Sequence, residues 1–123
     1  MCGIAGIIGP LASAELAQAM AQRLRHRGPD GDGVWSQPGV ALSHRRLAIQ
    51  DLTDAGRQPM VFDSHVLTYN GELYNHERLR TTLPGPWASS GDTEVLLRLL
   101  ATEGRAEQRQ GFEFRSERNA VRQ

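Results

Sequence analysis

Lysine is absent from the 123 residues, and cysteine occurs only once. All 14 basic residues are therefore arginine, and 14 acidic residues balance them, so the formal net charge is zero. A chain with no excess charge has no long-range field to attract nucleic acid or an anionic membrane surface. A single cysteine cannot form an intramolecular disulfide bond, which is typical of proteins in a reducing compartment.

The sequence also lacks a long hydrophobic run. Its apolar stretch at residues 4–8 is far shorter than the ~20 residues that cross a bilayer, and no basic segment precedes it as in a signal peptide. We therefore expect a cytoplasmic protein with no membrane and no nucleic-acid partner. The length suits one domain with a core of its own.

Short strand patterns and a few helix patterns alternate with turn residues. The close spacing of the turns favours antiparallel meanders over βαβ units, which predicts an α+β fold. We expect strands at residues 2–9, 33–36, 40–44, 47–49, 60–62 and 65–69, and helices at 14–25, from a cap at Asn75 to about 83, and from 93 to a stop at Gly104.

The composition changes after residue 104. Residues 105–123 are polar, rich in arginine and glutamine, and show neither a helical nor a strand period. This pattern predicts a domain over 1–104 followed by a disordered polar tail over 105–123.

Cys2 stands one position from the start of the sequence. If Met1 is removed, one residue carries both a thiol and a free α-amine, and their ordinary pKa values near ~8.5 and ~7.7–8.0 would let the amine act as the base for the thiol. A nucleophile paired with a base is the requirement for covalent acyl transfer. The alternative is a small, buried and inert cysteine at the head of a strand.

Four further residues or pairs each allow a structural and a functional interpretation. Asn70-Gly71 is typical of a hairpin turn, but its amide and backbone N–H groups could also form an oxyanion hole. Asp92 could be a helix N-cap, Arg46 a solvated cation at a strand end, and Glu72 an exposed turn acid. His26 and His44 lack the spacing of a metal site with Cys2, so we expect no metal.

Six stretches in order resemble the N-terminal glutaminase domain of class II glutamine amidotransferases, which are N-terminal-nucleophile hydrolases. They are MCGIAGI, RHRGPDG, SHRRLAIQDL, QPM, YNGELYNH and SGDTEVLL. The asparagine synthetase branch is the most similar, and the resemblance covers residues 1 to about 104. It implies a four-layer αββα sandwich of antiparallel sheets.

The resemblance also implies a role for each matching residue. Cys2 would be the nucleophile, with its own α-amine as the base, and Asn70 and Gly71 would form the oxyanion hole. Arg46 would bind the α-carboxylate of L-glutamine, while Asp92 and Glu72 would bind its α-ammonium group. The reaction would release glutamate and ammonia through a thioester, without a cofactor in this step.

The sequence departs from this family after residue 104. The family domain continues into further apolar strands, followed by a synthetase domain that uses ATP and magnesium, and neither pattern is found here. We therefore expect a truncated domain whose sandwich is incomplete at its C-terminal end. Ammonia would pass to a synthetase domain or subunit in trans; the alternative is an inactive remnant that at most binds glutamine or a partner chain.

Overall fold

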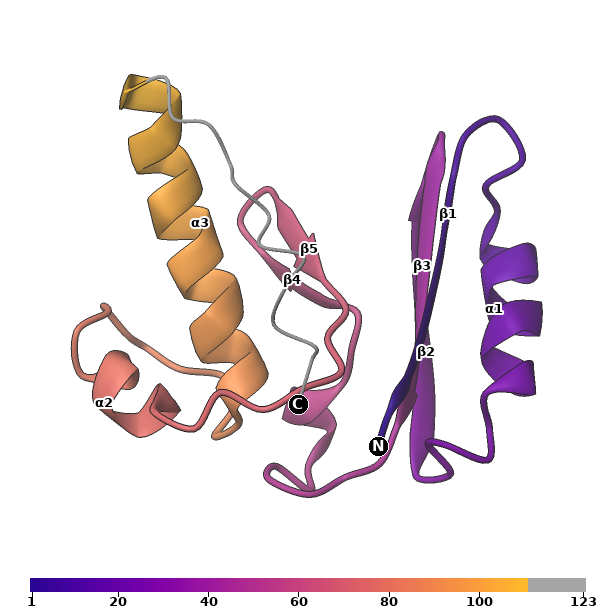
Figure 1. Ribbon diagram of the computed structural model, residues 1–123, viewed down its shortest axis with the longest axis horizontal. Coiled ribbons are helices and arrows are strands. Elements are labelled where there is room, and N and C mark those ends of the chain that lie inside the picture. Colours follow the sequence, from indigo (N-terminus) through magenta and orange to yellow (C-terminus); the bar gives the residue numbers. More distant parts are fainter. Residues whose placement is uncertain (111–123) are drawn as a thin grey trace, which may run out of the picture.

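A computed structural model describes the backbone of residues 1–110 and the side chains of residues 1–103. Its elements are β1 (Gly3–Ile8), α1 (Ala14–Arg23), β2 (Gly31–Gln37), β3 (Val40–Arg46), the 3-10 helix η1 (Asp54–Gly56), β4 (Met60–Phe62), β5 (His65–Leu67), α2 (His76–Arg80) and α3 (Asp92–Gln110). Figure 1 shows α3, the β4–β5 hairpin, the three-stranded sheet and α1 following one another across the molecule.

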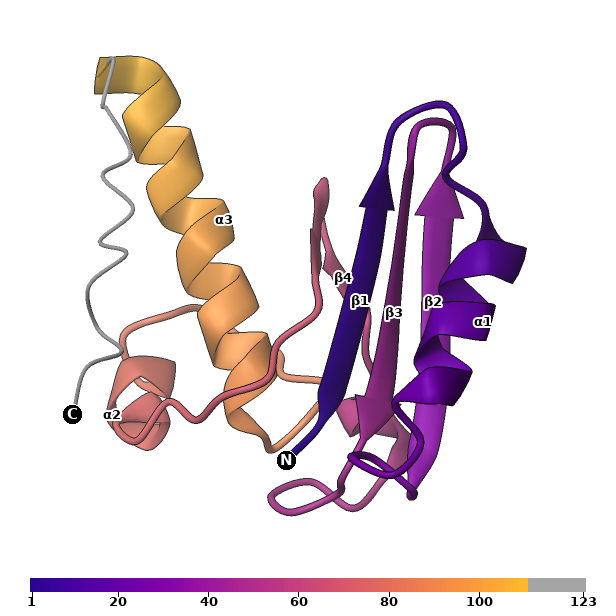
Figure 2. The same cartoon turned by 45° about the vertical axis from the view of Figure 1, so that its right-hand side comes forward.

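The larger sheet has the strand order β1-β3-β2, and both pairs are antiparallel. Helix α1 covers one of its faces, as Figure 2 shows. Small side chains make this contact, because Ala17 and Ala21 of the helix and Ala41 of β3 are fully buried. A Cβ atom on Gly3 would lie 2.8 Å from the Cβ atom of Leu24, so only glycine at position 3 allows this approach.

The opposite face of the sheet carries His44 and Arg46. Directly opposed residues of antiparallel strands share a face. Ile4 of β1 and Gly33 of β2 both oppose His44 of β3, and Gly31 opposes Arg46. A Cβ atom on Gly33 would lie 2.1 Å from the carbonyl oxygen of Gln58, so the chain before β4 crosses directly over this face.

The second sheet consists of β4 and β5 and packs against α3. Among the side chains of α3 that the structure describes, the buried apolar ones are Val95, Leu97 and Ala101. Arg98 forms a 2.7 Å ion pair with Glu94, and its guanidinium lies over the rings of Phe62 and Trp87. These contacts hold the loop before α3 against the helix and so fix where the helix begins.

The predicted α+β class with antiparallel sheets is confirmed, but the predicted strand at residues 47–49 is wrong. Strand β3 ends at Arg46 because β1 and β2 offer no partner beyond Arg45 and Arg46. The backbone N–H of Leu47 instead donates to the Cys2 sulfur, and that of Ala48 donates to Asp30. The chain turns out of the sheet at this point and forms part of the site.

The ends of all three predicted helices also differ from the prediction, and α1 ends at Arg23 instead of at residue 25. Helix α2 ends at Arg80, and the Asn75 side chain makes no capping hydrogen bond. Helix α3 continues through Gly104 to Gln110, since one interior glycine costs only ~1 kcal/mol relative to alanine. The predicted tail therefore begins as helix, and residues 111–123 lie outside the described residues. No helix in the described part of the chain is long and apolar enough to span a membrane.

Candidate active site

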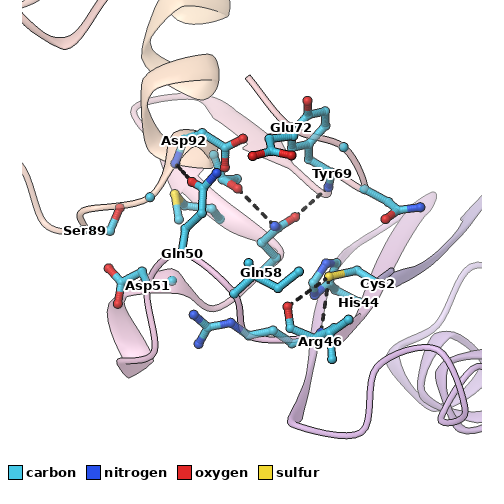
Figure 3. Close-up of a pocket in the computed structure, with 18 of the residues that line it drawn as sticks. Cys2, His44, Arg46, Gln50, Asp51, Gln58, Tyr69, Glu72, Ser89 and Asp92 are labelled. Carbon is cyan, nitrogen blue, oxygen red and sulfur yellow. Dashed lines mark hydrogen bonds between the residues drawn. The ribbon is translucent and has the colours of Figure 1, made fainter. Parts of the chain in front are cut away.

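A cavity of about 350 Å³ lies between the inner face of the larger sheet and the start of α3. This volume is within the range of sites for small molecules. All six site residues predicted from the sequence line it, namely Cys2, Arg46, Asn70, Gly71, Glu72 and Asp92. In Figure 3, Asp92 and Glu72 lie on one side of the cavity, and Cys2 and Arg46 lie on the other.

Chain topology explains why residues so distant in sequence meet here. Cys2 immediately precedes β1, and Arg46 is the last residue of β3. Because β1 and β3 are antiparallel, the start of one and the end of the other lie at the same end of the sheet. Asp92 is the first residue of α3, and Asn70 and its neighbours follow β5.

The Cys2 thiol is half-buried and is held by the backbone of one residue. The N–H of Leu47 donates to Sγ at 3.3 Å, and the thiol donates to the Leu47 carbonyl at 3.7 Å. Arg27 donates to the Cys2 carbonyl at 3.2 Å. Met1 also lines the cavity and is 73% exposed, so its removal would leave the Cys2 α-amine at the cavity wall.

The Arg46 guanidinium is positioned by the loop that contains η1. Its Nη1 donates to the carbonyl of Thr53 at 2.6 Å, and a Cβ atom on Gly56 would lie 2.4 Å from Nη2. Among the side chains that the structure describes, no carboxylate pairs with Arg46. A partly buried guanidinium without a counter-ion suits a planar carboxylate ligand.

Two carboxylates face the cavity with most of their hydrogen-bonding capacity unused. Asp92 is buried, and one of its oxygens accepts a 2.7 Å hydrogen bond from the backbone N–H of Leu73. Glu72 is exposed. The pKa of Tyr69 is raised, first by burial and then by the negative charges of Asp92 and Glu72. Both carboxylates therefore contribute negative potential at the Tyr69 side of the cavity.

The structural interpretations of Asn70-Gly71 and Asp92 are wrong. The described hairpin joins β4 and β5 and turns at Asp63 and Ser64, so Asn70-Gly71 is not a hairpin turn. Asp92 accepts from Leu73 instead of capping its own helix. A Cβ atom on Gly71 would lie 2.6 Å from the Tyr69 hydroxyl oxygen, and glycine therefore allows the ring to lie against this segment.

Three further residues build the walls and were not predicted as site residues, although they lie in the stretches SHRRLAIQDL and QPM. Gln50 accepts from the backbone N–H of Asp92 at 3.0 Å. Asp51 accepts from Thr53 and from the backbone N–H of Ser90, and these hydrogen bonds, led by the Thr53 hydroxyl, hold its pKa far below the usual range. The loop after β3 is thereby joined to the start of α3.

Gln58 is the third of these wall residues and is almost fully buried. Its side-chain oxygen accepts from the backbone N–H of Tyr69 at 2.6 Å, and its amide nitrogen donates to the Thr93 hydroxyl at 3.2 Å. One side chain thus fixes both the segment after β5 and the first turn of α3 (Figure 3).

His44 also lines the cavity and is only 1% exposed. Burial, with a smaller contribution from the charge of Arg46, lowers its pKa to about 4, and the backbone of Tyr69 opposes this shift. The imidazole is therefore uncharged at neutral pH. The described residues contain no cluster of histidine, cysteine or carboxylate side chains that could hold a metal.

Known proteins with similar sequences match most of the chain. A probable asparagine synthetase (glutamine-hydrolysing) from Dictyostelium discoideum is 39% identical over 114 residues, which cover 85% of this chain and 20% of the relative. Asparagine synthetase 2 of Oryza sativa subsp. japonica is 40% identical over 112 residues, covering 85% and 19%. Asparagine synthetase 3 of Bacillus subtilis is 39% identical over 108 residues, covering 79% and 17%.

The chain thus spans about a fifth of the length of these relatives. A family model described as a glutamine amidotransferase domain matches residues 1–113, which is nearly the whole chain. With that match and a cavity that contains all six predicted site residues, the chain belongs to the glutamine amidotransferase domain family.

Proposed function

We propose that this protein, once Met1 is removed, hydrolyses the side-chain amide of L-glutamine to glutamate and ammonia through a thioester on Cys2. One observation carries the proposal: the Cys2 thiol, the carboxylates of Asp92 and Glu72, and Arg46, which has no ion pair among the described side chains, line the same cavity. The family and the names of the relatives support glutamine as the substrate.

The charges in the cavity match those of a free amino acid. Arg46 binds the α-carboxylate through a bidentate guanidinium pair, and Asp92 and Glu72 accept hydrogen bonds from the α-ammonium group. A glutamine residue within a peptide has neither charged group. These three side chains therefore select the free amino acid over a protein-bound side chain.

The chemistry requires the α-amine of Cys2. The amine takes the thiol proton, and the sulfur attacks the amide carbon of the substrate while Asn70 and Gly71 donate to the oxyanion. The C–N bond of the substrate amide breaks, and the protonated α-amine of Cys2 gives its proton to the departing nitrogen, which leaves as ammonia. Water then attacks the thioester, the amine accepts its proton, and glutamate leaves as the thiol is restored.

The order of α1, the two sheets and α3 supports an αββα sandwich of the N-terminal-nucleophile hydrolase type. The two sheets would then form the walls of the site. Apolar side chains on β1 remain exposed, with Ile4 at 45% and Ile8 at 87%, which is consistent with further packing over this sheet.

We further propose that the ammonia is consumed by a synthetase domain or subunit in trans. The relatives are named asparagine synthetases, and this chain matches only about a fifth of each. ATP and magnesium would then be needed there and not in the glutaminase step, and both steps would take place in the cytoplasm.

The experiment is an intact-mass measurement followed by an assay of glutamate release. We expect loss of Met1, glutamate release that depends on L-glutamine, and none from Cys2→Ala. Cys2→Ser is the matched control because it keeps the size of the side chain and the free amine but has a weaker nucleophile. Equal release from the native protein and Cys2→Ala would refute the proposal.

A second candidate is a protein that binds glutamine without hydrolysing it, which the exposed apolar surface of β1 favours because incomplete packing loosens a site. Calorimetric titration of the native protein with L-glutamine separates the two candidates. Binding without glutamate release, together with a broad thermal unfolding transition, would identify the second.

A further inference from the structure

The segment that carries the proposed oxyanion hole is not held by a sheet or a helix. It lies between β5, which ends at Leu67, and α2, which begins at His76. No helix or strand includes Asn70 or Gly71, so no ladder of backbone hydrogen bonds fixes their donor groups. The donors of an oxyanion hole must lie about 2.7–3.1 Å from the developing charge, and other contacts must therefore hold this segment in place.

The side chains of Gln58 and Asp92 hold the two ends of this segment. The Gln58 side-chain oxygen accepts from the backbone N–H of Tyr69, directly before Asn70, at 2.6 Å (Figure 3). At the other end, Asp92 accepts from the backbone N–H of Leu73 at 2.7 Å. Asp92 is also expected to bind the substrate, whereas Gln58 has no such task. Replacement of Gln58 therefore separates positioning of the segment from binding of the substrate.

Gln58 is itself fixed to rigid parts of the fold. It is 8% exposed, and its backbone carbonyl oxygen lies so close to β2 that a Cβ atom on Gly33 would be 2.1 Å away. Its amide nitrogen donates to the Thr93 hydroxyl in the first turn of α3 at 3.2 Å. A backbone N–H can only donate, so the amide oxygen of Gln58 must face Tyr69. A buried polar group that is satisfied at both ends makes its surroundings rigid.

We propose that Gln58 is a positioning residue for the oxyanion hole, whose side-chain amide holds the Asn70 amide and the Gly71 N–H at the distance that the transition state requires. This rests on the proposed function, because the oxyanion hole belongs to the same reaction. Gln58 then acts on the transition state and not on the bound substrate. Its loss lowers kcat and leaves KM for glutamine unchanged, because the side chains that bind the charged ends of glutamine keep their own contacts.

The test compares variants of Gln58 in the otherwise native protein. Gln58→Met keeps nearly the same length but cannot accept from Tyr69, and we expect kcat to fall ~10- to 100-fold with KM unchanged. Gln58→Glu keeps an acceptor oxygen at the same position, and the Thr93 hydroxyl can donate to its second oxygen, so we expect it to restore most of kcat. Gln58→Asn is one methylene too short to reach both partners, and we expect the same fall in kcat even if Gln58→Met does not fold.

Alkylation of Cys2, the only cysteine, by iodoacetamide separates this role from a purely structural one. The sulfur displaces iodide and no oxyanion forms, so we expect the same rate constant in the native protein and in Gln58→Met. A changed rate constant would show that Gln58 only supports the fold around Cys2, and would overturn the inference. An unchanged kcat in Gln58→Met would also overturn it and leave the proposed function standing. No glutamate release from the native protein would overturn both.

Discussion

The carboxylate of Asp92 accepts a 2.7 Å hydrogen bond from the backbone N–H of Leu73. This bond joins the first residue of α3 to the segment that contains Asn70, Gly71 and Glu72. Because Asp92 also lines the cavity, the same carboxylate that we expect to bind the substrate's ammonium group holds the proposed oxyanion hole in place.

Replacement of Asp92 by asparagine separates these two roles. The amide oxygen of Asp92→Asn can still accept from Leu73 but carries no charge, so we expect KM for glutamine to rise ~10- to 100-fold, the value of a charged hydrogen bond, with little change in stability. Asp92→Ala removes both the charge and the acceptor for the Leu73 N–H. We expect it also to lower kcat and the free energy of unfolding. Steady-state kinetics and urea unfolding distinguish the variants, and equal KM values for Asp92→Asn and the native protein would contradict the assignment.

Arg46 is expected to require its guanidinium and not only its charge. Arg46→Lys keeps the charge but loses the paired donors and the contact with Thr53, so we expect a rise in KM of ~10-fold or more. Arg57→Gln is the matched control. Arg57 is exposed on the same loop, pairs with Asp54 and does not line the cavity that contains Cys2 and Arg46. A comparable rise in KM for both variants would show that the loop, and not the Arg46 side chain, determines binding.

Gly71 has no room for a side chain beside Tyr69. The Cβ atom of Gly71→Ala would lie 2.6–2.8 Å from the Tyr69 ring and hydroxyl, and the ring would have to move. We expect a fall in kcat of ~10²-fold or more if the Gly71 N–H moves out of the oxyanion hole. In the control Gly31→Ala the nearest atom is 3.9 Å away, and we expect kcat to be unchanged; full activity of Gly71→Ala would show that its N–H does not stabilise the oxyanion.

The stability of the protein should fall between pH 6.5 and pH 4. His44 has a pKa of about 4 when folded and an ordinary value of 6.5, so the unfolded chain binds an extra proton in this range. The free energy of unfolding therefore decreases as pH falls, by at most about 3 kcal/mol. Asp51, whose pKa is lowered by its hydrogen bonds, adds to the loss only below this range.

Urea unfolding of the native protein and His44→Phe at several pH values checks this prediction. Between pH 6.5 and 4 we expect the free energy of unfolding to change less with pH in His44→Phe, because that variant has no group to protonate at position 44. Parallel curves for the two proteins would show that His44 is already protonated in the folded state or retains its ordinary pKa.

Turn residues and strand patterns are local signals, and they allowed the antiparallel α+β class to be predicted. The six site residues were predicted from the family resemblance, and all six line the cavity. The strand expected at residues 47–49 was wrong because strand length depends on where the partner strands end. Gln58 was missed for a related reason. Its partner Thr93 is 35 residues away, and no spacing within the sequence relates a glutamine to a distant hydroxyl.

The position of Cys2, directly before β1 and held through its sulfur to Leu47, has a practical consequence when the chain contains no lysine. After Met1 is removed, the α-amine of Cys2 is the only primary amine in a protein of this sequence. In a uniformly ¹⁵N-labelled protein, the primary-amine nitrogen resonance would therefore come from this group alone. Its shift with pH would report the titration of the proposed catalytic base, with no overlap from other amines.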